Sequence, residues 1–143
     1  MVLQNSESTS ILVFDPIGNI KDVNIGFQKS FGYSRESIIG KNFSMLFIEE
    51  DIRKKLPEKV LNKVMKTGSS HDENYLKHKN GSKIWVHGEC IYVKDENGQG
   101  HVVKIIQDLN AEKKLEKKLK EKNEEQKRII KDNATFIYTA SHD

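Results

Sequence analysis

The chain of 143 residues is long enough for one domain of ordinary size with a short extension. Its composition, 36% hydrophobic and 31% charged, supports a packed core and excludes a wholly disordered chain. The 24 basic and 21 acidic side chains leave a net charge of +3, too small to indicate a nucleic-acid partner. A single cysteine, Cys90, excludes an internal disulfide and a zinc site built from cysteines. No apolar run approaches the roughly 20 residues that span a bilayer, so we expect a cytoplasmic location and no membrane segment in this chain.

The first half of the chain predicts two strands followed by several short helices. The apolar segments 11–14 and 20–23 flank a stretch with a proline and a glycine in positions typical of a turn, which predicts a hairpin. Asn24 is expected to cap a helix that carries Phe27 and Phe31 on one face and ends at Gly32. The later helical signals are a start at Ser34, a stop at Gly40, a short segment with Leu46 and Phe47, and a longer helix with the apolar stripe Val60, Leu61, Val64 and Met65 before Gly68.

The second half changes toward a period of two, which is typical of strands. Segments 73–78, 82–93 and 101–107 read as strands, and the turn signals Asn80-Gly81 and 95–98 separate them. Two strands, several helices and three hairpin-connected strands predict an α+β domain: a five-stranded antiparallel sheet with helices on one face. Both faces of segment 82–93 carry large apolar side chains, so we expect the N-terminus or another chain to cover the second face.

Four stretches, in this order along the chain, resemble the PAS sensory domain. They are Val13-Phe-Asp-Pro-Ile-Gly-Asn-Ile20, the segment 24–41 with Phe27, Phe31 and Glu36, the segment 80–98, and the exit 107–113. The resemblance implies a sheet with strand order 2-1-5-4-3 and a cavity between the sheet and the helices. It places an N-terminal segment at 1–10 and the PAS domain, with its C-terminal strands, at 11–110.

Some PAS domains hold haem, flavin or a small metabolite, and others hold nothing and act as dimerisation modules. A flavin photoadduct requires a cysteine in the helical segment, whereas Cys90 lies in a late strand and is expected to fill the core. His71 is nearest to the position of a haem ligand, but it lies in a polar turn and is expected to be solvated. His78, His87 and His101 are not spaced like metal ligands. The sequence therefore indicates no metal site and no evident cofactor, and the PAS ligand is unknown.

Residues 111–135 are expected to form a coiled-coil signalling linker. Helix formers fill this segment without a breaker, and a stripe repeats at steps of four and three. A charged helix cannot bury this stripe alone, which predicts a parallel homodimer; a solvated helix packed on its own domain is the alternative. Ile130 and Ile137 fit a shifted register, so the coil is either imperfect or bistable. The expected seam comprises Leu115, Leu119, Gln126, Ile129, Asn133 and Phe136.

The final residues, 136–143, resemble the start of the phospho-acceptor helix of sensor histidine kinases. The match consists of Phe136 followed at the expected distance by Ser141-His142-Asp143. The resemblance implies that His142 accepts the phosphoryl group and that Asp143 is its acidic neighbour. A neutral imidazole is nucleophilic near pH 7, which suits this chemistry. The motif is cut in its middle and no ATP-binding element follows, so this chain alone is expected to be inactive as a kinase.

These features predict the sensory input and signal-transmission part of a two-component sensor histidine kinase. The PAS signal would pass through the dimeric coil to autophosphorylation of His142, with ATP as cofactor and a response regulator as partner of the full-length protein. A non-enzymatic PAS dimerisation scaffold and a haem- or flavin-binding sensor module are the alternatives. The residues expected to transmit the signal out of the domain are Asp108, Leu109, Asn110 and Ala111.

Overall fold

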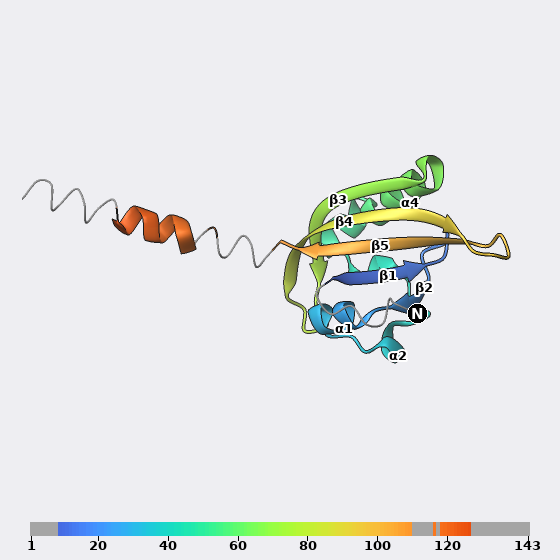
Figure 1. The fold of residues 1–143 in the computed structure, drawn as a ribbon, viewed down its shortest axis with the longest axis horizontal. Coiled ribbons are helices and arrows are strands. Elements are labelled where there is room, and N and C mark those ends of the chain that lie inside the picture. Colours follow the sequence, from blue (N-terminus) through green and yellow to red (C-terminus); the bar gives the residue numbers. More distant parts are fainter. Residues whose placement is uncertain (1–8, 110–115, 117, 127–143) are drawn as a thin grey trace, which may run out of the picture. The chain divides into compact units, whose positions relative to one another are not determined.

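The computed structural model describes residues 9–109, 116 and 118–126. Five strands form one antiparallel sheet, and Figure 1 shows them side by side in the order β2-β1-β5-β4-β3. This order confirms the predicted one. The strands are β1 (Ser10–Phe14), β2 (Ile20–Val23), β3 (Ser69–Lys77), β4 (Lys83–Lys94) and β5 (Gly100–Asp108).

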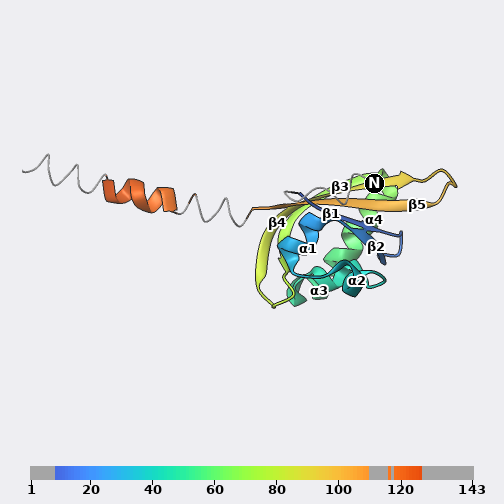
Figure 2. The same cartoon turned by 60° about the horizontal axis from the view of Figure 1, so that its bottom comes forward.

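The helices between β2 and β3 cover one face of this sheet, as Figure 2 shows. We call that face inner and the opposite face outer. The short helix α3 was not predicted as an element separate from the longer helix α4. The helical elements are α1 (Ile25–Phe31), α2 (Arg35–Ile38), the 3-10 helix η2 (Phe43–Leu46), α3 (Glu49–Arg53) and α4 (Leu56–Thr67).

Asn24 joins the start of α1 to β1, as its predicted capping role requires. Its Oδ1 accepts hydrogen bonds from the backbone N–H groups of Phe27 and Ile11, both at 2.9 Å. Its Nδ2 donates to the carbonyl of Thr9 at 2.6 Å. Gly32 ends the helix with a φ of 79°, a left-handed conformation that glycine adopts without steric cost. The sequence signals at both ends of α1 are therefore confirmed.

Aromatic rings fill much of the layer between the sheet and the helices. Phe14 of β1 stacks on Phe43 of η2 with ring centroids 4.3 Å apart, and Phe27 stacks on Phe31 at 4.9 Å. Cys90 is fully buried in this layer, which confirms its expected place in the core. The other buried apolar side chains include Leu12, Ile20, Val23, Phe47, Val64, Leu76, Val86, Val102 and Ile106.

Two local predictions were wrong. The third strand begins at Ser69 rather than Glu73, so His71 lies within β3 and not in a turn, although it is exposed as expected. Polar side chains hid the start of this strand, because Ser70 faces the core where the pattern calls for an apolar residue. Met65, expected in the apolar stripe of α4, is 41% exposed.

The outer face of the sheet keeps apolar side chains in contact with solvent. Ile91 and Val93 of β4 are 44% and 40% exposed, and Ile105 of β5 is 36% exposed. Residues 9–109 cover these side chains only in part, so the expected cover by the N-terminus or another chain stays a prediction. In the part of the chain that the structure describes, no helix is long and apolar enough to cross a membrane.

Candidate functional site

Three buried polar side chains and a fourth that is largely buried lie on the inner face of the sheet, beside a mostly apolar core. We call Ser70, Asp72 and Asn74 of β3 with Lys104 of β5 the inner polar cluster. The side chains of Lys104 and Asp72 are 1% and 10% exposed, and Lys104 Nζ lies 3.7 Å from Asp72 Oδ2. Ser70 and Asn74 are also buried. Charged side chains are rarely buried this deeply unless they are paired, which makes the cluster the main electrostatic feature of the core.

Strand register brings the two charges together. Asp72 lies opposite Gly88 of β4, and Lys104 lies opposite the adjacent inward position, Cys90. A Cβ atom on Gly88 would lie 2.7 Å from Lys104 Cε and 3.3 Å from Asp72 Oδ1. The lysine side chain therefore reaches across β4 only because residue 88 is a glycine.

The hydrogen-bonding capacity of this cluster is largely unused. Both carboxylate oxygens of Asp72, Oδ1 of Asn74 and Nζ of Lys104 are buried without a hydrogen-bond partner among the described residues. Lys104 Nζ lies 5.1 Å from the centre of the Phe47 ring, within the range of a cation–π contact. Burial raises the pKa of the neighbouring Cys90 thiol, and the Lys104 ammonium opposes that rise. Buried polar atoms normally make hydrogen bonds, so this group of atoms, held by one ion pair and without hydrogen bonds of its own, marks a candidate site.

The histidines named in the sequence analysis lie elsewhere. His87 lies on the outer face, with Nδ1 3.5 Å from Glu73 Oε1 and Nε2 3.3 Å from Glu89 Oε1. His101 Nε2 lies 3.0 Å from Asp95 Oδ2, and His78 Nδ1 accepts a hydrogen bond from the backbone N–H of residue 80. Among the described residues, no group of three or more His, Cys, Asp or Glu side chains is placed to hold a metal ion.

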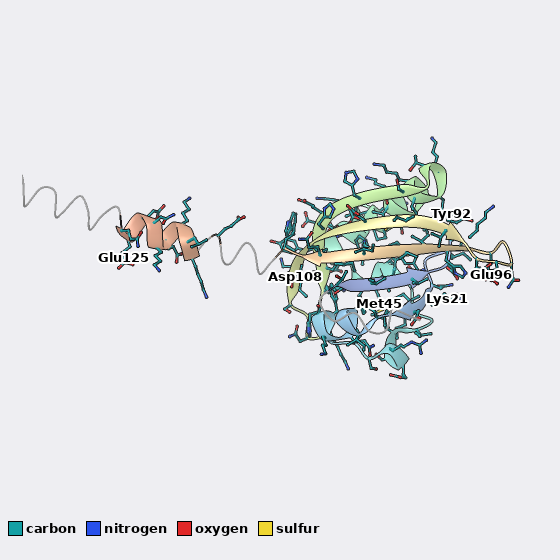
Figure 3. The ribbon with its side chains drawn as sticks, viewed as in Figure 1. Lys21, Met45, Tyr92, Glu96, Asp108 and Glu125 are labelled. Atoms are coloured by element: carbon teal, nitrogen blue, oxygen red, sulfur yellow. The ribbon has the colours of Figure 1, made fainter. Side chains whose placement is uncertain are left out.

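The expected signal exit begins at the end of β5. Asp108 is the last residue of β5 and lies opposite Val86 of β4, at the strand end labelled in Figure 3. The backbone N–H of Leu109 donates to the carbonyl of Trp85 at 2.9 Å, which ties the chain to β4 one residue beyond the strand. The chain divides into two units between Leu109 and Asn110. Asn110 and Ala111 lie outside the described residues.

The structure describes only part of the expected coiled-coil seam. Residues 118–126 are helical, and within them Leu119 is 51% exposed and Gln126 is exposed. The seam and the phospho-acceptor therefore stay predictions. The other residues of these two sites, outside the described part of the chain, are Leu115, Ile129, Asn133, Phe136, His142 and Asp143.

Sequence reasoning missed the inner polar cluster. A signal was present in β5, where Lys104 takes the inward position between Val102 and Ile106. A lysine between two core positions of one strand face indicates either an exposed face or a buried charge. Which of the two holds depends on a counter-ion for the lysine, and that counter-ion is Asp72, which is distant in sequence.

The sheet has the strand order 2-1-5-4-3, short helices cover one of its faces, and the chain leaves it from the central strand β5. Together these features define the α+β fold of PAS sensory domains. The profile of the PAS domain family matches residues 8–111. The chain therefore belongs to the PAS family.

Known proteins are similar to this chain in both sequence and fold. Two-component system protein A of Emericella nidulans is 29% identical over 134 residues, which are 94% of this chain and 19% of that protein. The PAS domain of a Colwellia psychrerythraea protein is 28% identical, with a TM-score of 0.68 over 77% of this chain and 92% of that one. A domain of a sensor histidine kinase/response regulator from Geobacter sulfurreducens has a TM-score of 0.63 at 17% identity, covering 75% and 88% of the two chains. That last likeness shows the fold alone.

Proposed function

We propose that this chain is the sensory input and signal-transmission part of a two-component sensor histidine kinase. One observation carries the proposal. The similarity to a two-component system protein spans 134 residues of this chain, whereas the PAS match ends at residue 111. Because only nine of the 143 residues lie outside that similarity, it continues past residue 111 into the expected coil. Because this chain spans only 19% of that relative, the kinase activity belongs to the proposal.

The proposed signal path starts in the PAS core and leaves along β5. Asp108, Leu109, Asn110 and Ala111 pass the change to the coil, which carries it to His142. At about 1.5 Å per helical residue, the span from residue 109 to residue 142 covers roughly 50 Å. His142 then attacks the γ-phosphate of ATP in the full-length protein, with Asp143 beside it, and a response regulator receives the phosphoryl group.

The proposed active unit is a parallel homodimer. The exposed apolar side chains of Ile91, Val93 and Ile105 on the outer face support it, because a second copy can bury them. Ile91→Asp should shift the full chain toward monomer in sedimentation velocity. Ile17→Asp is the matched control, since Ile17 is 74% exposed in the turn between β1 and β2. An equal shift in both variants, or in neither, would contradict this interface.

Phosphorylation of the full-length protein tests the kinase proposal directly. His142→Gln should abolish acid-labile labelling by radioactive ATP, while His78→Gln should leave it intact. Inserting one residue after Gln126 should change the labelling rate, because it rotates the coil seam by about 100°. Persistent labelling in His142→Gln would favour a PAS scaffold or another acceptor, and an unchanged rate after the insertion would refute transmission through the coil.

A further inference from the structure

The solvent side of α4 carries lysines in one row. Lys59, Lys63 and Lys66 are exposed and follow one another at steps of four and three residues. At about 100° per residue, their side chains fall within an arc of about 60° on the helix surface. Lys55, also exposed, is the N-cap residue of the helix. We call these four residues the α4 lysine row.

The charges of the α4 lysine row are not compensated by residues 9–109. None of the four ammonium groups has an ion-pair partner in that range, whereas the neighbouring Lys54 lies 3.1 Å from Glu50 Oε1. Glu58, the one acidic side chain of α4, is turned about 80–140° away from the three helical lysines. Like charges three or four residues apart destabilise a helix. The row therefore costs helix stability, and contact with an anionic surface removes that cost.

We propose that the α4 lysine row binds the surface of a membrane that contains anionic phospholipids. Lysine ammonium groups are hydrated point charges on flexible stems, which suits contact with a fluid layer of lipid phosphates. Protein interfaces are instead enriched in arginine and depleted in lysine, so the composition of the row does not favour a protein partner. The net charge of only +3 for the whole chain does not favour a nucleic acid.

The spacing of the lysines lets them act on a membrane together. Lys59 and Lys66 are separated by about 10.5 Å along the helix axis, close to the Debye length of about 10 Å in 0.1 M salt. Each lysine held near an anionic surface strengthens binding by about fivefold. The helices cover the inner face of the sheet (Figure 2), so contact through α4 leaves the outer face free for the proposed dimer.

The test is sedimentation of the full chain with phospholipid vesicles. The chain should bind vesicles of phosphatidylcholine with about 30 mol% phosphatidylglycerol, but not vesicles of phosphatidylcholine alone, and added salt should weaken the binding. Lys59→Gln/Lys63→Gln should weaken it by about 25-fold, because two lysines of the row are lost. Glutamine forms helices about as well as lysine, so this variant should fold.

The matched control is Lys79→Gln/Lys94→Gln. It removes the same charge from two exposed lysines at the β3–β4 and β4–β5 turns, and its affinity for the anionic vesicles should stay within about twofold of the wild-type value. Equal weakening in the two double variants would contradict the proposal, because general attraction between chain and vesicle would then explain the binding.

Other outcomes would also overturn a membrane role for the α4 lysine row. These are wild-type affinity in Lys59→Gln/Lys63→Gln, or no binding of the wild type to the anionic vesicles. If the row is required for binding to polyglutamate or to duplex DNA, and the vesicles do not bind, the partner is an acidic protein or a nucleic acid instead. The assay involves neither dimerisation nor phosphoryl transfer, so its result is separate from those of the Ile91 and His142 experiments.

Discussion

The buried pair of Asp72 and Lys104 should respond differently to the loss of one charge and to the loss of both. Asp72→Val leaves the ammonium of Lys104 without a counter-ion at 1% exposure, which should cost about 3–5 kcal/mol of folding free energy. Lys104→Met leaves the Asp72 carboxylate, which is 10% exposed, without a counter-ion, so the cost of this variant should lie near the lower end of that range. The double variant replaces both charges with apolar side chains of similar shape. The free energy of unfolding of the double variant should be within about 1 kcal/mol of the wild-type value or should exceed it.

Urea unfolding measures these differences. Trp85 is the only tryptophan of the chain and lies on β4 with its ring 4.9 Å from that of Tyr75, so its fluorescence reports on the sheet. With a urea dependence of about 1–3 kcal/mol/M, a loss of about 3 kcal/mol moves the midpoint by about 1–3 M. Glu50→Ala is the control, because it breaks an exposed pair with Lys54 and should leave the midpoint unchanged. A double variant as unstable as Asp72→Val would refute the coupling between the two charges.

Other features of the domain give three further expectations. Asn24→Ala removes the oxygen that accepts from Phe27 and Ile11 and should lower stability by about 2–4 kcal/mol in the same urea assay; an unchanged midpoint would show that these bonds are dispensable. Burial raises the pKa of the Cys90 thiol, so iodoacetamide should modify the native chain far more slowly than the urea-unfolded chain, and equal rates would contradict its burial. Burial acts to raise the pKa of Asp15, but backbone N–H groups of its own turn outweigh it, and the pKa is lowered. The stability that Asp15 contributes is therefore present above its unfolded pKa and lost as pH falls through the lower folded value, so acid titration of Asp15→Asn should show a smaller loss than the wild type; equal losses would refute this.

The sequence predicted those parts of the fold whose signals are local. Asn24 and Gly32 mark the two ends of α1 because capping depends on residues within one or two turns. Asn80-Gly81 marks the β3–β4 hairpin for the same reason, and Gly81 has a φ of 91°. The strand order came from the family resemblance and not from these signals, since local residues do not determine which distant strands pair.

The candidate site could not be predicted because it depends on register between distant strands. Asp72, Gly88 and Lys104 lie 16 residues apart along the chain, and nothing local relates them. Their polarity also misplaced an element boundary, since an inward Ser70 and Asp72 read as a turn. The cluster breaks the alternation of apolar and polar residues in both β3 and β5, and such breaks are expected where a site has a role other than packing.

The position of Lys104 on β5 relates this cluster to the proposed signal exit. β5 pairs with β1 on one side and β4 on the other, and it ends at Asp108, four residues beyond Lys104. A close-packed core does not absorb a shift at one side chain by gradual compression, so a change at Lys104 must be accommodated by its strand or by the helices that cover it. Phe47 is the covering group, and β5 is the strand that leads out of the domain. A change at Lys104 therefore acts on the strand whose end carries Asp108 and Leu109, which gives the proposed sensor a physical route from its core to its output.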